Sequence, residues 1–236
     1  MDSRTIALIG MEAYQKLKEK KVMIFGAGGV GGYVIESLAR SGIGGMTIVD
    51  FDKITISNLN RQIISLQSTL GRDKAEVAAM RIKDINPDIK VKYEVKRVEE
   101  ESMGSFSLEE YDYVIDAIDD VKGKLAIIQT AKTAGIPVIS CMGTGNKLNP
   151  MQLRVADIGE TEICPLARVV RKELRKAGIQ DGVKVVYSAE IPIESELQEE
   201  GRKVPASMVF VPGTAGLLIG SIVAWDLMNM HQIKDE

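Results

Sequence analysis

A glycine-rich turn between a buried strand and an amphipathic helix constrains the fold of this chain more than any other feature. The stretch VMIFGAGGVGGYVIESLARSG, residues 22–42, places Gly26, Gly28 and Gly31 in a G-x-G-x-x-G pattern, with Gly29 in the same turn. Glycines here permit a tight turn and let the backbone approach phosphate groups at the N-terminus of the helix. The pattern predicts a nucleotide-binding βαβ unit.

Strand and helix patterns alternate along the chain, which is typical of parallel βαβ units. A buried strand is expected at residues 21–26, and further strands are expected at 46–51, 89–95, 110–119 and 136–143. The connecting helices are expected at residues 29–42, 71–86 and 122–135. We therefore expect an α/β fold with a Rossmann-like, doubly wound, mainly parallel sheet.

The second part of the chain changes character and predicts a mixed C-terminal extension of the sheet. Strands are expected at 153–158 and 183–190, a helix at 165–178, and a polar surface loop, either mobile or ordered, at 191–205. At 236 residues the chain lies near the upper edge of one domain. We interpret residues 1–236 as one adenylation domain, with a nucleotide-binding half (1–150) and a substrate-side half (151–236).

The apolar stretch MVFVPGTAGLLIGSIVAWDLM, residues 208–228, has almost the length of a membrane span. Pro212 and Gly213 interrupt it, so we expect a short strand followed by a helix over about 214–230. Gly216 and Gly220 would let this helix pack closely on the core, which we favour over a membrane anchor. The N-terminus also lacks the apolar region of a signal peptide, so we expect a cytoplasmic, reduced protein.

The glycine turn alone leaves the nucleotide open, since NAD and ATP both suit it. Asp50 ends the second strand, where a carboxylate can bind ribose hydroxyls, and Asp52 follows it. Arg61 and Lys74 come after the same strand. Backbone N–H groups already serve the pyrophosphate of a dinucleotide, so two further cations favour a triphosphate. Solvated surface positions are the alternative for each of the two.

Asp119 and Asp120 end the fourth strand, on the same edge of the sheet as the glycine turn. A carboxylate beside phosphates repels them unless a cation lies between. Asp119 is therefore a candidate Mg²⁺ ligand, because Mg²⁺ prefers one or two carboxylates plus phosphate oxygens. Capping of the following helix is the alternative role for Asp119, and one residue can do both.

The cysteine and histidine content of the sequence gives little support for thiol, zinc or imidazole chemistry. The two cysteines, Cys141 and Cys164, stand far apart without a CxxC pair, and His231 is the only histidine. We expect His231 to be a solvated surface group and Cys141 a buried core thiol. Cys164 stands beside Pro165 at an expected helix start, and we favour a structural role for it over a reactive one.

Four ordered motifs, GAGGVG, VDFDKITISNLNRQ, GRDKAE and DAIDD, resemble the adenylation domain of the ubiquitin-activating-enzyme superfamily. Its bacterial members adenylate the sulfur carriers of molybdopterin and thiamine synthesis. The resemblance implies that Asp50 binds ribose, that Asn58, Arg61 and Lys74 hold the phosphates, and that Asp119 organises Mg²⁺. It also implies a homodimer in which an N-terminal arginine, here Arg4, reaches the partner's ATP. The first arginine of the usual pair is absent.

The later stretches SCMGTGNKLNP, VADIGETEICPLARVVRKELRKAGI and VKVVYSAEIP resemble the tRNA threonylcarbamoyladenosine dehydratases, so the likeness covers nearly the whole chain. This implies ATP-dependent cyclisation of the threonylcarbamoyl group on the adenosine just 3′ of the anticodon, and leaves a sulfurtransferase partner open. The closest alternative adenylates the C-terminus of a ubiquitin-like carrier, and the missing CxxC pairs count against it. An NAD(P) oxidoreductase and a nucleotide-binding adaptor without turnover are further alternatives.

Contact with tRNA requires a local basic patch, since the formal net charge is −3. Arg168, Arg171, Lys172 and Arg175 are spaced to share one helix face, where they would neutralise tRNA phosphates. A solvated face is the alternative. Lys147, in the glycine-rich loop after the fifth strand, is expected to face the crevice and meet the substrate or its anticodon loop, or else to be a loop lysine without a partner.

Overall fold

A seven-stranded sheet forms the centre of the fold, in the order β3-β2-β1-β4-β5-β7-β6. The computed structural model describes residues 2–199 and 202–230, so His231 lies outside the described part. All neighbouring strands are parallel except β6, which pairs antiparallel with β7. The mainly parallel sheet and its mixed C-terminal extension are confirmed. The strands are β1 (Lys21–Phe25), β2 (Gly45–Val49), β3 (Lys90–Glu94), β4 (Tyr113–Asp116), β5 (Val138–Cys141), β6 (Leu153–Asp157) and β7 (Lys184–Ser188).

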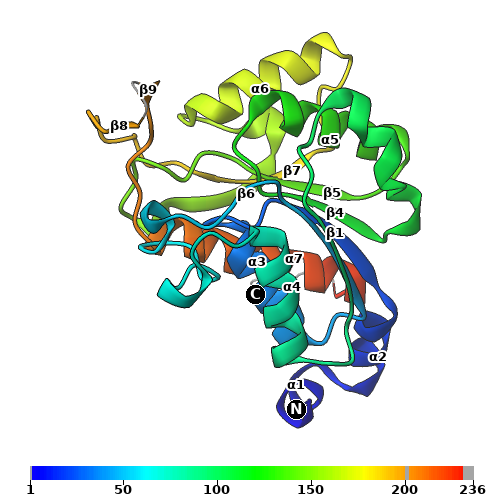
Figure 1. Ribbon diagram of the computed structural model, residues 1–236. Helices are drawn as coiled ribbons and strands as arrows, with labels where there is room; N and C mark the ends of the chain where they lie inside the picture. Colours follow the sequence, from blue (N-terminus) through cyan, green and yellow to red (C-terminus); the bar gives the residue numbers. More distant parts are fainter. Residues whose placement is uncertain (1, 200–201, 231–236) are drawn as a thin grey trace.

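Helices cover both faces of the sheet (Figure 1). One face carries α3 (Gly31–Ser41), α4 (Lys74–Ile85) and α7 (Phe210–Met228), and the other carries α5 (Val121–Thr133) and α6 (Pro165–Lys176). Two N-terminal helices, α1 (Ser3–Ile9) and α2 (Met11–Glu19), precede β1. Short 3₁₀ helices lie in the connections: η1 (Ile56–Asn58), η2 (Gln67–Thr69), η3 (Glu100–Phe106), η4 (Leu108–Glu110), η5 (Pro150–Gln152) and η6 (Ile158–Glu160).

The central strands are apolar on both sides because both faces are covered. Val22 and Ile24 of β1 pack into the core beneath α3 and α7, whereas Met23 and Phe25 pack into the core beneath α5 and α6. Successive side chains of a strand point to opposite faces, so a doubly covered strand reads as a continuous apolar run. Packing against both cores holds the strands in place, so the carboxyl ends of the parallel strands lie together at one edge of the sheet.

Helix α7 packs closely on α3, as the glycines at 216 and 220 predict. A Cβ on Gly216 would lie 2.4 Å from the carbonyl oxygen of Val30, and one on Gly220 would lie 2.0 Å from Ser37 Oγ. The helix has the length and mean hydropathy, 1.5, of a membrane span, but 61% of its apolar stretch is buried inside the molecule. This burial agrees with the expected core helix.

The short strand expected before this helix is wrong. Helix α7 begins at Phe210, and Pro212 lies in its first turn. A proline is tolerated there because its missing N–H group would have no partner within the helix. The expected loop over 191–205 also contains a short hairpin, β8 (Gln198–Glu199) and β9 (Arg202–Lys203), which lies at the upper left of Figure 1.

Candidate functional site

A cavity of about 560 Å³ lies at the carboxyl edge of the sheet, where β1, β2, β4 and β5 end. The loops after these four strands form its wall, together with the start of α6 and residues on both sides of the β8–β9 hairpin. In open α/β sheets ligands bind at this edge. The cavity is therefore the candidate functional site.

The glycine turn forms the floor of the nucleotide half. Gly26, Gly28 and Gly29 line the cavity, and Gly26 has a φ of +93°. Gly31 contributes differently, because a Cβ there would lie 1.9 Å from the carbonyl oxygen of Gly26. Only glycine permits this approach, which brings the N-terminus of α3, with its free N–H groups, against the turn. This geometry is suited to the phosphate cradle that was expected.

Asp50 ties the end of β2 to the glycine turn. Its Oδ2 accepts a hydrogen bond from the N–H of Ala27 at 2.7 Å, and its Oδ1 accepts one from the N–H of Asp52 at 2.8 Å. Burial raises the pKa of the Asp50 carboxyl. Each carboxylate oxygen keeps acceptor capacity toward the cavity that it lines, so a ribose hydroxyl can donate to it.

Lys74 and Asp52 form an ion pair in the cavity wall. Lys74 is the first residue of α4 and only 6% exposed, and its Nζ lies 2.8 Å from Asp52 Oδ2. The Asp52 side chain is far more exposed than that of Lys74. The pair holds a buried cation in place beside the phosphate cradle, where it can interact with an incoming anion.

Arg61 lines the cavity and is oriented by its own loop. Its Nη1 donates to the carbonyl oxygen of Ser57 at 2.8 Å and to Asn60 Oδ1 at 3.1 Å, which leaves other guanidinium N–H groups for a ligand. Asn58 is not among the cavity-lining residues of the described chain. Its Oδ1 accepts the N–H of Thr55 at 3.1 Å, so Asn58 orders the loop that carries Arg61.

The two aspartates after β4 have separate positions. Asp120 caps α5, because its Oδ2 accepts the N–H of Gly123 at 2.7 Å. The capping role considered for Asp119 therefore belongs to Asp120. Asp119 is exposed, lines the cavity and makes no hydrogen bond to any other residue of the described part.

Asp119 fits the chemistry of a magnesium site that is completed by a nucleotide. Residues 2–199 and 202–230 contain no cluster of three or more His, Cys, Asp or Glu side chains able to hold a metal. A lone carboxylate suits Mg²⁺, because this ion is usually bound by one or two carboxylates together with phosphate oxygens and water. The donor set is thus compatible with Mg²⁺ bound to a triphosphate.

Gln62 is a wall residue that the sequence patterns did not single out. It is 6% exposed and lines the cavity, and its Oε1 has no hydrogen-bond partner in the described structure. A buried amide oxygen without a donor is costly, so a ligand N–H, a hydroxyl or a water is expected to bind it. Its position directly after Arg61 in NLNRQ was the available signal.

A buried ion pair behind the wall joins the loops after β4 and β5. Asp116 and Lys124 are both fully buried, with 3.0 Å between Oδ2 and Nζ. Lys124 Nζ also donates to the carbonyl oxygen of Cys141 at 2.6 Å, and Ser140 Oγ donates to the same Asp116 oxygen at 2.5 Å. Asp116 Oδ1 accepts the N–H of Ile118 at 3.2 Å. The pair therefore positions both the Asp119 loop and the loop after β5.

The second half of the cavity, here called the acceptor half, comprises the wall from Cys141 to Lys147 and from Cys164 to Leu166. Cys141 is buried as expected, and burial raises the pKa of its thiol to about 12, so it is protonated at neutral pH. Cys164 precedes α6 and is also buried. Both thiols thus contribute wall surface between the strand ends and α6.

Lys147 lines the acceptor half of the cavity, the position expected for it, but its side chain is only 4% exposed. Its Nζ donates to the carbonyl oxygens of Gly143 at 2.9 Å and Ser188 at 3.2 Å. The alternative of a loop lysine without a partner is wrong. A direct contact to an anticodon-loop phosphate would require an exposed ammonium, which Lys147 does not present.

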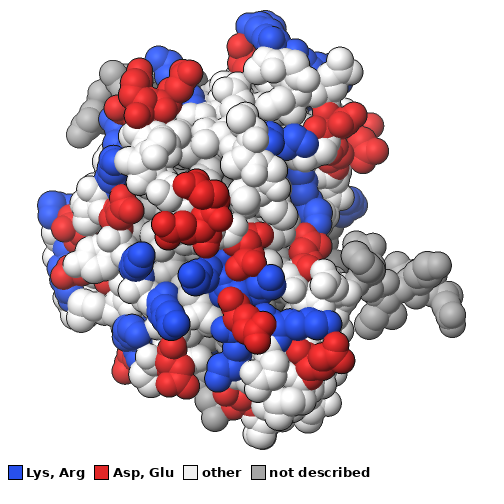
Figure 2. Space-filling view, turned by 90° about the vertical axis from the view of Figure 1, so that its right-hand side faces the viewer, with Lys and Arg blue, Asp and Glu red and all other residues white. Residues whose placement is uncertain are grey.

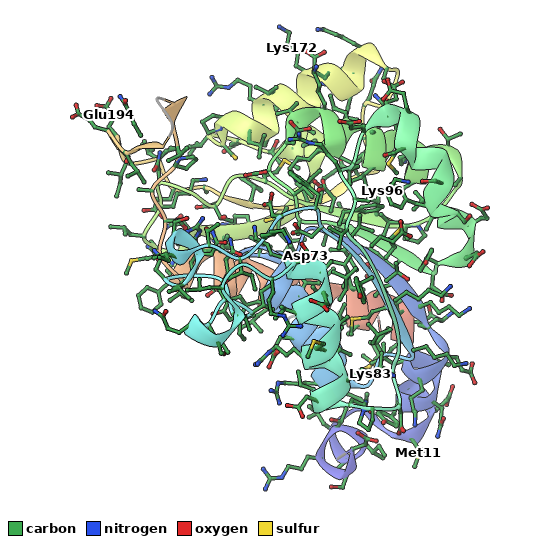
Figure 3. All side chains as sticks on the ribbon, in the orientation of Figure 1. Met11, Asp73, Lys83, Lys96, Lys172 and Glu194 are labelled. Atoms are coloured by element: carbon green, nitrogen blue, oxygen red, sulfur yellow. The ribbon has the colours of Figure 1, made fainter. Side chains whose placement is uncertain are left out.

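The four basic residues of α6 differ in their exposure and in their contacts. Arg168, Lys172 and Arg175 are exposed, and Figure 3 shows Lys172 on the outer side of the helix. Arg171 is half-buried, and its Nη1 donates to the carbonyl oxygen of Thr161 and, at 2.6 Å, to Thr161 Oγ1. Arg171 therefore fixes the segment before α6 and is unsuited to a tRNA phosphate.

Arg4 lies on α1, exposed, and is not among the described residues that line the cavity. Figure 1 shows α1 at the lower end of the molecule, remote from the β8–β9 hairpin at the upper left. A contact between Arg4 and a nucleotide would thus involve the cavity of another copy.

Comparison with known proteins matches the ThiF family to residues 2–230. A tRNA threonylcarbamoyladenosine dehydratase of Bacillus subtilis is 40% identical, over 98% of this chain and 96% of the Bacillus protein. The tRNA threonylcarbamoyladenosine dehydratase 2 of Saccharomyces cerevisiae is 34% identical over 95% of this chain, which spans 55% of the yeast protein.

The fold is also shared with a solved relative. The tRNA threonylcarbamoyladenosine dehydratase of Escherichia coli, solved in complex with ATP, superposes with a TM-score of 0.88 at 32% identity. The match covers 96% of this chain and 93% of the solved chain. The similarity therefore includes the acceptor half and the C-terminal helix as well as the nucleotide half.

Proposed function

This chain belongs to the ThiF family, and from that membership we propose that it is an ATP-dependent tRNA threonylcarbamoyladenosine dehydratase. The full-length likeness to the Bacillus subtilis dehydratase is the observation that carries the proposal. The cavity supports it with a nucleotide half around the glycine turn and an acceptor half around Lys147. The sequence also lacks the CxxC pairs expected of an enzyme that adenylates a carrier protein.

In the first step the threonyl carboxylate of the modified adenosine attacks the α-phosphorus of ATP. An acyl-phosphate bond forms, the bond to pyrophosphate breaks, and an acyl-adenylate results. Two anions approach each other in this step, so positive groups in a partly buried site stabilise it. Arg61 and the buried Lys74 supply these charges beside the glycine turn. Asp119 would hold Mg²⁺, which supplies further positive charge when bound to the phosphates.

In the second step the ureido group of the same modification attacks the activated carbonyl carbon. The ring closes, AMP leaves with the former carboxylate oxygen, and the ureido nitrogen loses a proton. The nucleoside thereby loses the elements of one water. Intramolecular attack needs little assistance, since effective molarities reach on the order of 10⁵ M or more.

Pyrophosphate release tests the proposed function directly. Purified protein with ATP and Mg²⁺ is expected to release pyrophosphate when tRNA bearing threonylcarbamoyladenosine is added, and not with the unmodified tRNA. Mass spectrometry of the digested tRNA should show a nucleoside lighter by one water. No pyrophosphate release with either tRNA, under conditions where ATP binds, would contradict the proposal. It would favour the C-terminal carboxylate of a carrier protein as the substrate.

We also propose a cytoplasmic homodimer in which Arg4 of one chain reaches the ATP of the other. The exposure of Arg4 and its position away from its own cavity support this arrangement. Sedimentation equilibrium should give the mass of two chains. A monomer that turns over at the full rate would contradict it.

We assign tRNA binding to the exposed positive residues of α6, Arg168, Lys172 and Arg175. The face at the right of Figure 1 is less suited to RNA. Figure 2 shows that positive and negative side chains are interspersed on it, so it offers no continuous basic surface. We expect alanine at any of the three positions to reduce the slope of log K against log salt for tRNA by about 0.7 to 0.9, because one phosphate contact is lost. Binding titrations at several salt concentrations measure this slope.

Two variants on the same helix serve as controls. Lys176 is already paired with Glu173 at 2.8 Å, so Lys176→Ala should change the slope less. Arg171→Ala should lower the melting temperature, because Thr161 loses its partner, and leave the slope unchanged. Equal salt slopes for the wild type and all three exposed-residue variants would contradict the assignment.

A further inference from the structure

Lys147 places a buried ammonium group in the wall of the acceptor half without a counter-ion. Its two hydrogen-bond partners, Gly143 and Ser188, offer neutral carbonyl oxygens. Glu190 is a nearby carboxylate, but its oxygens accept the N–H groups of Leu148, at 3.0 and 3.2 Å, and of Asn149, at 2.9 Å. No ion pair joins Lys147 to a carboxylate of the described residues.

A buried cation without a counter-ion is unfavourable, which points to an anionic ligand. Taking an ammonium out of water costs several kcal/mol unless an opposite charge compensates it. Burial accordingly lowers the pKa of Lys147. The ammonium has three N–H donors and uses two of them on the carbonyl oxygens, so one donor is left for the cavity that Lys147 lines.

The position of Lys147 separates it from the phosphate cradle. Arg61 and Lys74 follow β2, beside β1, whereas Lys147 follows β5, and β4 lies between β1 and β5. Strand β5 is two strand spacings, about 10 Å, from β1, which carries the glycine turn, and three spacings, about 14 Å, from β2. The phosphates already have the cations on the β1–β2 side. The group that reaches Lys147 therefore belongs to the second substrate.

We propose that Lys147 binds the carboxylate of the threonylcarbamoyl group and holds it for attack on ATP. This inference rests on the proposed function, because that reaction brings a carboxylate into the acceptor half. The buried Cys141 and Cys164 in the same wall limit the access of water to the ammonium. Lys147 thereby selects the acid form of the substrate, and the residues of α6 bind the tRNA around it.

Two substitutions test this role against a matched control. Lys147→Met removes the charge, and Lys147→Gln removes it while keeping N–H donors for Gly143 and Ser188. The control is Lys83→Met, on α4 (Figure 3), whose exposed Nζ also donates to two carbonyl oxygens, those of Pro87 at 3.0 Å and Ile89 at 2.6 Å. Steady-state pyrophosphate release is measured against both substrates.

We expect both Lys147 variants to raise the KM for modified tRNA about 10-fold to 100-fold. This range corresponds to the binding free energy that a hydrogen bond to a charged group contributes. The KM for ATP should stay within about twofold, and Lys83→Met should match the wild type in both. An unchanged KM for modified tRNA would overturn the proposal. So would an equal loss of affinity for unmodified tRNA, which would indicate a phosphate contact, or an equal rise in the KM for ATP.

A measurement on the wild type keeps the proposal open to refutation if both variants fold poorly. The nucleoside threonylcarbamoyladenosine should bind at least about 10-fold more tightly than its carboxamide, because only the acid carries the charge. This preference should disappear in Lys147→Gln. Equal binding of acid and amide by the wild type would contradict the role of Lys147. Absence of dehydration by the wild type would instead refute the proposed function.

Discussion

Asp119→Ala is expected to lower kcat/KM for pyrophosphate release by about 100-fold to 1,000-fold, the cost of removing a group that stabilises transition-state charge. Asp119 is the carboxylate of the cavity wall that is left free when Asp120 caps α5. Its loss should weaken Mg²⁺ at the triphosphate, so the half-saturating Mg²⁺ concentration should rise as well. Initial rates at a series of Mg²⁺ concentrations measure both effects.

The same substitution should leave the fold intact, because Asp119 is exposed and makes no hydrogen bond to other described residues. The melting temperature should match that of Asp88→Ala, an exposed acidic residue that is not in the cavity wall and serves as a control for activity. Near-normal turnover of Asp119→Ala would refute its assignment to the site. A large drop in melting temperature would show a structural cause for the lost activity.

The sequence predicted those parts of the site that depend on where strands end. Asp50, Arg61 and Asp119 were expected in one crevice because each follows a parallel strand, and the structure places all three in the cavity wall. The glycine turn could be predicted for a more local reason: Gly31 and Gly26 meet within one βα unit. Topology and short-range sterics can be inferred from the order of residues.

Details that depend on side-chain packing could not be predicted in this way. Spacing on a helix put Arg171 in a basic stripe, but its hydrogen bonds to Thr161 direct it elsewhere. Loop position suggested an accessible Lys147, and packing against the end of β7 buried it. Pro212 and Gly213 suggested a break, although a helix tolerates proline in its first turn.

The buried pair Asp116 and Lys124 was missed for a related reason. Each stands in an apolar run, VIDAID and GKLAII, where one charged residue is usually placed at the surface. Asp116 is the last residue of β4, and Lys124 lies in the first turn of α5. Only the packing of that helix on the sheet brings the two groups together.

Lys124→Met is expected to lower the free energy of unfolding by about 3 to 5 kcal/mol, because it leaves the Asp116 carboxylate buried without its cation. Both side chains are fully buried, and the carbonyl oxygen of Cys141 loses its 2.6 Å donor as well. A loss of this size is a large fraction of the 5 to 15 kcal/mol typical of folded domains. Equilibrium urea unfolding of the wild type and the variant measures it.

Two further variants separate the unpaired charge from the loss of packing. Lys53→Met removes an exposed ion pair to Asp73, 2.8 Å long, and should cost no more than about 1 kcal/mol. Adding Asp116→Asn to Lys124→Met should recover part of the loss, since the uncompensated carboxylate is then gone while Ser140 still has an acceptor. Equal losses for the buried and the exposed lysine would contradict this account. So would a double variant less stable than Lys124→Met alone, because the penalty would then not arise from the charge on Asp116.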